Sequence, residues 1–188
     1  MTSIRTFIAF DTPNPIREKI LSLQSELKKA NADVKWEPQE KFHATIKFLG
    51  NVNESILPDV IAKVQSVVVN SSAFDVTYQT LGSFPDKNNP RVIWIGCENP
   101  DGKLQSMKKN LDSELLTFGF EIEKRSFHPH ITLGRVKSSR GIKHLTPMLE
   151  KLTFEPHEAR IHGILVMKST LKPQGSVYEI LKEIQLTL

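Results

Sequence analysis

Two copies of a His-x-Thr triplet are the part of this sequence best suited to chemistry. The first copy is His43-x-Thr45 and the second is His130-x-Thr132. Imidazole titrates near neutral pH, so one ring of a pair can accept a proton while the other donates one. A threonine hydroxyl beside each ring can donate a hydrogen bond to an anionic oxygen. Two such pairs, facing each other across one cleft, would suit acid–base chemistry on a phosphate ester.

The residues around each triplet alternate between apolar and polar, as in a β-strand with one buried face. The first triplet lies within residues 42–49 and the second within residues 129–136. Period two alone places Lys47 on the same face as His43 and Thr45, away from the core. The same alternation places Arg135 on the apolar face, so a role for it at the polar face requires a bend at Gly134.

The two triplets occupy matching positions of an internal duplication. His43 and His130 are 87 residues apart, and the same offset places Ile4–Phe10 on Arg91–Cys97. The sequence therefore predicts a repeat over residues 1–87 and 88–174, followed by a C-terminal strand over 175–188. Two copies are too few for a solenoid, so we expect one bilobal domain over 1–188.

Hydrophobic periodicity and turn residues predict alternating strands and helices, and so an α+β fold. Expected helices cover residues 15–30, 58–69, 104–118 and 146–151. Expected strands cover 4–10, 34–36, 42–49, 74–81, 91–95, 120–124, 130–136, 161–168 and 177–186. Residues 82–90 are rich in Gly, Pro and Asn and predict a loop.

The bulk composition is that of an ordinary globular protein of 188 residues, with 39% hydrophobic and 24% charged residues. No apolar stretch is long enough to span a membrane, and the first residues lack the pattern of a secretion signal. The single cysteine, Cys97, excludes an intrachain disulfide and weakly favours a reducing compartment. We therefore expect a cytoplasmic protein that does not bind membranes.

A basic segment brackets the second triplet. Between Lys124 and Leu149 the sequence has six basic residues and no acidic one. A local positive field beside a candidate site favours an anionic substrate. A solvated basic edge without a ligand explains the same pattern equally well.

Metal and thiol chemistry fit this sequence less well. His128 and His130 could chelate a metal, but no carboxylate lies on the same predicted strand. Cys97 ends an apolar strand and is expected to be a small buried side chain. We therefore expect no metal and no cofactor.

Taken together, these segments resemble the two-histidine phosphoesterase superfamily, and most closely its RNA 2′,3′-cyclic phosphodiesterases, also called 2′-5′ RNA ligases. The resemblance runs along the whole chain. It rests on residues 5–10, 34–36, 43–50, 91–96, 127–135, 169–171 and 175–178. The family implies a bilobal α+β fold in which each lobe has an antiparallel sheet with helices outside and the cleft lies between the lobes. It also implies metal-free hydrolysis of an RNA 2′,3′-cyclic phosphate end to a 2′-phosphomonoester.

The resemblance also assigns roles to the two triplets. His43 would be the proton donor to the leaving 3′ oxygen, and His130 the proton acceptor that activates water. Thr45 and Thr132 would hold the phosphate oxygens.

Two further residues match positions that bind substrate in the family. Arg135 matches an arginine that closes the second motif and would add positive charge. Phe10 would stack on a base, although a core position for this ring is as good an interpretation.

Other functions use the same residues. One is a non-catalytic module that binds RNA ends, and another is a phosphodiesterase of small cyclic nucleotides. Weak, reversible 2′-5′ ligation would need no new residue, because an alcohol replaces water. No helical seam requires a partner, so we expect a monomer whose substrate is an RNA end or a related nucleotide.

Overall fold

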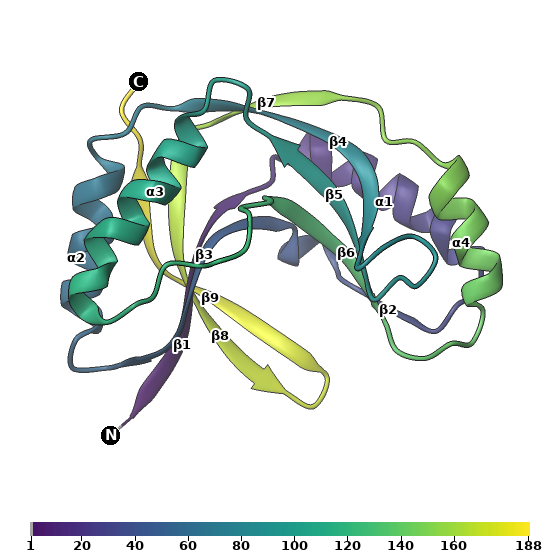
Figure 1. Cartoon of the computed structure of the whole chain (residues 1–188), viewed down its shortest axis with the longest axis horizontal. Coiled ribbons are helices and arrows are strands. Elements are labelled where there is room, and N and C mark those ends of the chain that lie inside the picture. The colour runs from purple at the N-terminus through teal and green to yellow at the C-terminus, as the bar shows by residue number, and fades with distance from the viewer. Residues whose placement is uncertain (1) are drawn as a thin grey trace.

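The computed structural model of the protein describes residues 2–188, and its strands form one curved antiparallel sheet (Figure 1). The strands run in the order β7-β4-β5-β6-β3-β1-β8-β9, and β2 pairs beside β6. Their bounds are β1 Ser3–Asp11, β2 Val34–Trp36, β3 His43–Asn53, β4 Phe74–Phe84, β5 Val92–Glu98, β6 His130–Val136, β7 His157–Ile161, β8 Gly163–Lys172 and β9 Gly175–Gln185.

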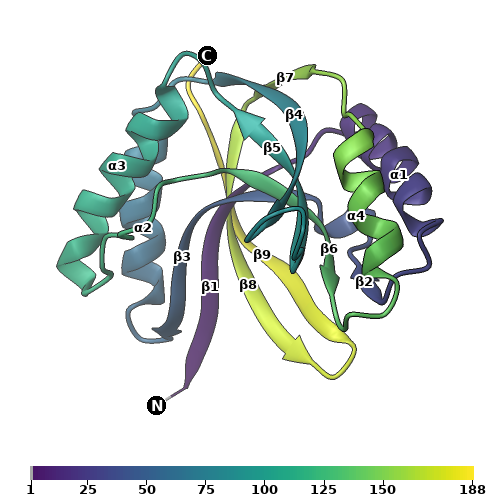
Figure 2. The same cartoon turned by 45° about the vertical axis from the view of Figure 1, so that its right-hand side comes forward.

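Four α-helices flank the sheet in two pairs at opposite ends (Figures 1 and 2). They are α1 Asn14–Lys28, α2 Leu57–Val68, α3 Lys103–Leu115 and α4 Ile142–Lys151, with short 3₁₀ turns η1 Gln39–Lys41 and η2 Leu116–Phe118. Helix α2 packs on α3, and α1 packs on α4. In the described part of the chain, no helix is both long and apolar enough to cross a membrane.

The helices bury the stripes that the sequence periodicity indicates. In α1 the side chains of Ile16, Ile20, Leu23 and Leu27 are buried, at spacings of three to four residues. Pro15 lies in the first turn, where a missing backbone N–H costs nothing. The predicted α+β class and the flanking helices are therefore confirmed.

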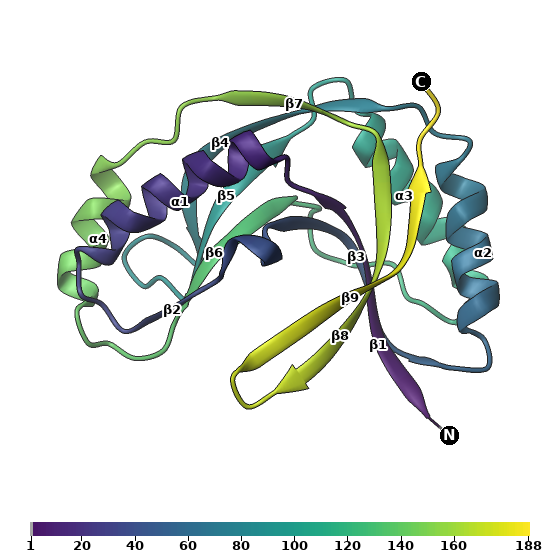
Figure 3. The same ribbon diagram turned by 180° about the vertical axis from the view of Figure 1, so that it is seen from behind.

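The two halves of the sheet interlace the two sequence repeats (Figure 3). Strands β1 and β3 come from the first half of the chain, but β1 pairs with β8 from the second half, and β9 pairs beyond β8. At the other end of the sheet, β4 from the first half lies between β5 and β7 from the second and pairs with both. Each lobe therefore needs both repeats, and neither repeat has a closed core of its own. The repeat boundaries at residues 87 and 174 stay a prediction.

The halves meet where the two His-x-Thr triplets lie. Among the described residues, one pair joins β3 to β6, and it is Ala44 with Ile131, the middle residue of each triplet. Both side chains are fully buried. Because neighbouring residues of a strand point to opposite faces, the flanking His and Thr side chains all lie on the other face of the sheet.

A β-bulge follows each triplet at the equivalent position. In β3, Ile8 pairs with Lys47 and Ala9 with Thr45, so Ile46 has no opposite residue. In β6 the register shifts in the same way across Leu133, which lies 87 residues after Ile46. A bulge of one residue reverses the alternation beyond it.

The two bulges decide where the next side chains point. The expectation that Lys47 lies on the face of His43 was wrong, because the bulge turns its side chain into the interior, where it is 1% exposed. Phe48 is turned outward instead. The bulge at Leu133 likewise brings Arg135 to the face of Thr132, which supplies the bend that strict alternation lacked.

Three other predictions from the sequence differ from the structure. Residues 120–124 form no strand, because they lie in a segment that follows η2 and leads to β6 without a pairing partner. Strand β4 runs on to Phe84, so the loop after it is shorter than predicted. Phe10 pairs with Ala44, and Ile95 pairs with Ile131, the residue that is equivalent to Ala44 in the second repeat. Phe10 and Ile95 are therefore equivalent positions of β1 and β5, and they are 85 residues apart, where the sequence predicted 87.

Lys47 belongs to a buried charge network. Its Nζ donates to Asp112 Oδ1 at 2.6 Å and to the carbonyl of Glu121 at 2.9 Å. Lys108 Nζ donates to the other oxygen of Asp112 at 2.5 Å. Burial works to raise the pKa of Asp112, but the hydrogen bonds and charges of Lys108 and Lys47 outweigh it and hold this pKa below its usual value. The network ties β3 and α3 to the segment before β6.

Removing Asp112 should destabilise the protein strongly. Asp112→Ala leaves two buried ammonium groups without their carboxylate, and we expect a loss of about 3–5 kcal/mol in the free energy of unfolding. Urea denaturation at pH 7 measures it. The control is Glu150→Ala on the exposed face of α4, expected to cost less than about 0.5 kcal/mol. Similar values for the two variants would contradict the role given to the network.

Candidate active site

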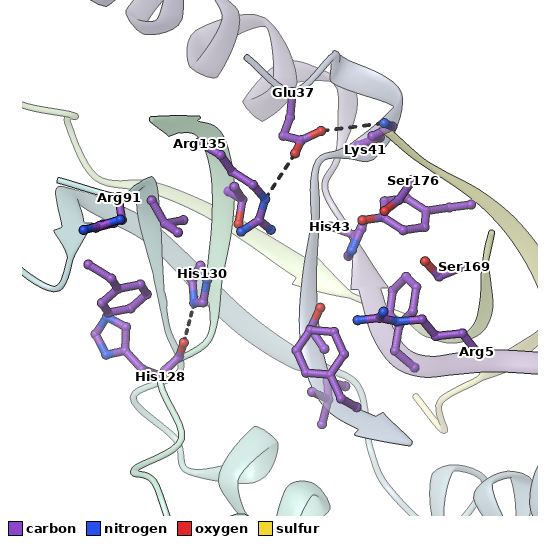
Figure 4. Close-up of a pocket in the computed structure, with 18 of the residues that line it drawn as sticks. Arg5, Glu37, Lys41, His43, Arg91, His128, His130, Arg135, Ser169 and Ser176 are labelled. Carbon is purple, nitrogen blue, oxygen red and sulfur yellow. Dashed lines mark hydrogen bonds and ion pairs between the residues drawn. The ribbon is translucent and has the colours of Figure 1, made fainter. Parts of the chain in front are cut away.

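A cleft of about 1290 Å³ opens on the face of the sheet that carries the two triplets (Figure 4). Its walls come from both halves of the sheet. Strand β3 contributes His43 and Thr45, and β6 contributes His130 and Thr132. The structure therefore brings these four predicted site residues into one cleft, across the pair Ala44–Ile131.

Arg135 also lines the cleft, but Phe10 does not. The Phe10 side chain is 0% exposed and packs edge-on against Phe74 in the core, with ring centroids 5.8 Å apart. The expectation that it meets substrate is therefore corrected. From β1 the cleft is lined by Arg5, Thr6 and Phe7, so the aromatic ring that β1 contributes is Phe7.

The hydrogen bond of His130 sets its tautomer. The Nδ1 atom lies 2.7 Å from the carbonyl oxygen of His128. A carbonyl can only accept, so Nδ1 carries the hydrogen and donates it. The neutral ring then has an unprotonated Nε2 that can take a proton. His43 bonds to the backbone of Lys41, also two residues earlier.

Burial and nearby cations favour the neutral form of both rings. Burial lowers the pKa of His43 to about 4, assisted by the charges of Arg17 and His130 and opposed by the bond to Lys41. Burial also lowers the pKa of His130, as do the charges of His128 and Arg135. A bound anion would oppose these shifts.

Aromatic rings surround each histidine. The His43 ring lies 5.0 Å from Phe7 and 5.1 Å from Tyr178, between centroids. The His130 ring lies 5.1 Å from Phe84 in an edge-to-face contact. These rings limit the rotamers of both histidines and account for much of their burial.

The cleft is strongly cationic. Its described lining includes two carboxylates and nine basic side chains, namely Arg5, Lys35, Lys41, Arg91, Lys124, Arg125, Arg135, Lys137 and Lys172. Glu37 holds two of them, with Arg135 Nε at 3.5 Å and Lys41 Nζ at 3.7 Å (Figure 4). Such a field attracts a polyanion. Within residues 2–188, no three His, Cys, Asp or Glu side chains are grouped to hold a metal ion.

The fold and the paired imidazoles define a two-histidine phosphoesterase architecture, and the comparisons agree. The model of the family described as LigT like phosphoesterase matches twice, over residues 10–94 and 95–178. The chain belongs to this family.

Relatives named RNA 2′,3′-cyclic phosphodiesterase align with nearly the whole chain. The RNA 2′,3′-cyclic phosphodiesterase of Methanocaldococcus jannaschii is 36% identical over 96% of this chain and 99% of its own. The protein so named from Thermotoga maritima is 33% identical over 97% and 95%. The solved structure of E. coli LigT in apo form has a TM-score of 0.79 at 24% identity and covers all of both chains, which shows the shared fold.

Several residues that line the cleft could not be identified as site residues from the sequence. Phe7 and Phe48 look like core residues in an apolar strand, and only pairing and bulges turn them to the cleft. Tyr178 and Glu37 both line the cleft that contains His43. Tyr178 lies 135 residues after His43 in the sequence, and Glu37 lies 6 residues before it. Tyr178 lies within residues 175–178, which belong to the family resemblance, but the resemblance did not indicate a role for its side chain.

The low pKa of His43 predicts a specific loss of stability in acid. The unfolded chain takes up this proton below pH 6.5, whereas the folded protein takes it up only near pH 4. The unfolded state therefore binds more protons in that window, and stability falls as pH falls. His43→Gln should remove at most about 3 kcal/mol of the loss between pH 7 and pH 4.

Urea denaturation of the wild type and the variant at several pH values measures this effect. The matched control is His144→Gln, at an exposed position on α4, whose profile should follow the wild type. Parallel curves for wild type and His43→Gln would show that the His43 imidazole is not depressed in the folded protein.

Proposed function

We propose that this protein is an RNA 2′,3′-cyclic phosphodiesterase that opens a cyclic phosphate end to a 2′-phosphomonoester. The observation that carries the proposal is the convergence of two His-x-Thr pairs on one face of the sheet, around a single cationic cleft. Relatives named RNA 2′,3′-cyclic phosphodiesterase, which align over almost the full chain, support the same reaction. The substrate is an RNA end, or a related nucleotide.

Each histidine has a separate role in this reaction. His130 is the base, because its Nδ1–H donates to His128 and leaves Nε2 free to take a proton from water. His43 is the acid that protonates the leaving 3′ oxygen. Burial lowers its pKa to about 4, so the negative charge of the bound phosphate must raise this pKa before the ring can donate.

The remaining site residues hold the phosphate. Thr45 and Thr132 lie two residues after the histidines and donate hydroxyl hydrogen bonds to the non-bridging oxygens. Arg135, held at 3.5 Å by Glu37, adds positive charge where negative charge develops. This chemistry uses acid, base and charge from the chain itself, and the proposal includes no metal and no cofactor.

The same site can pass the cyclic phosphate to a 5′ hydroxyl, since an alcohol can replace water. We expect this 2′-5′ ligation to be weak and reversible. A monomeric state and a cytoplasmic location remain predictions. Two alternatives are a phosphodiesterase of small cyclic nucleotides and a module that binds RNA without turnover, and the following experiment separates the second from the proposed function.

His43→Ala and His130→Ala should each lower kcat by about 10²–10⁴-fold, because each removes one proton transfer. The assay follows an oligoribonucleotide that ends in a 2′,3′-cyclic phosphate and identifies the hydroxyl that retains the phosphate. We expect the 2′-phosphate as product and full activity in EDTA.

His162→Ala, at an exposed position between β7 and β8, is the matched control and should retain activity. Thermal melting of each variant checks the fold. Near-normal turnover by either active-site variant would exclude the two-imidazole mechanism. RNA affinity without turnover by the wild type would identify a binding module instead.

A further inference from the structure

An exposed aromatic ring lies on the cleft wall beyond the proposed reaction centre. Phe48 on β3 is 60% exposed and lines the same cleft as His43. The bulge at Ile46 puts it there, because without the bulge its side chain would join the core face. The equivalent position on β6 is Arg135, so one wall offers a ring and the other a guanidinium.

The ring of Phe7 separates Phe48 from His43. Phe7 is 3% exposed, and its centroid lies 5.0 Å from the His43 ring and 6.1 Å from the Phe48 ring. Phe48 is therefore one ring further from the reacting phosphate. A nucleoside with its ribose at His43 is too close to the centre to cover Phe48, whereas the next nucleotide of the strand reaches it.

The surroundings of Phe48 fit a nucleotide better than a protein. Arg5, on the paired strand β1, extends along the same wall (Figure 4). Leu171 of β8 is also exposed in this cleft and widens the apolar surface. A second copy of the chain would bring two cationic clefts face to face, which like charges oppose. A base on an aromatic ring with a phosphate on arginine is the usual way to bind single strands.

We propose that Phe48 and Arg5 form a subsite for the penultimate nucleotide of a single-stranded RNA end. Phe48 stacks on its base, and Arg5 binds the phosphodiester that links it to the terminal nucleotide. This subsite rests on the proposed function and adds a preference for a strand over a mononucleotide.

Three substrates separate the two contacts. The first is a nucleoside 2′,3′-cyclic phosphate, the second a dinucleotide ending in that group, and the third the same dinucleotide with an abasic 5′ nucleotide. Phe48→Leu should lower the ratio of kcat/KM for the intact dinucleotide to that for the mononucleotide about tenfold, mainly through KM. The abasic dinucleotide should show no such drop, and Phe48→Tyr should restore the wild-type ratio.

Arg5→Ala should weaken both dinucleotides alike, because both retain the internal phosphodiester. Ile180→Ala, exposed on β9 outside the cleft lining, is the control for loss of an exposed apolar side chain. An unchanged ratio in Phe48→Leu, or an equal loss on all three substrates, overturns the subsite. Failure of the wild type to open any of them overturns the proposed function instead, so the two failures are distinct.

Discussion

The backbone pairing of Ala44 with Ile131 is the contact on which the site depends. It joins two curved half-sheets at one point, and that point is the middle residue of both triplets. Since both middle side chains are buried in the core, both histidines and both threonines must lie on the opposite face. A slip of one residue in this pairing would turn one triplet into the interior and separate the imidazoles.

Two equivalent β-bulges then shape the walls of the cleft. Each follows its triplet directly, and each reverses which side chains face the cleft beyond it. On β6 the result is Arg135 beside Thr132, which adds positive charge to the site. On β3 the result is Phe48 at the cleft and Lys47 in the interior, where it bonds to Asp112. The same backbone feature, a bulge after each copy of the motif, therefore gives the two walls of the cleft different side chains.

The surroundings of the two histidines disfavour their charged forms. Burial and surrounding cations lower the pKa of both imidazoles, and nine basic side chains line the walls. An anionic substrate changes this balance, because its charge offsets the cations and favours a protonated His43. A protonated His43 is therefore favoured when an anionic substrate is bound, and the basic side chains that line the cleft attract that substrate.

The sequence by itself determined which face of each strand carries the histidines and threonines, and much of the secondary structure. The spacing of His43 and Thr45, repeated at His130 and Thr132, required only period two to predict which face carries them. Local patterns contain this information, because side-chain direction within a strand depends on neighbours in sequence. The tertiary structure alone decided that the repeats interlace, that Phe10 lies in the core and that Phe48 lies in the cleft. Those outcomes depend on which strands pair and where a β-bulge interrupts the pairing. Sequence patterns do not determine them, because the paired segments lie far apart in the chain.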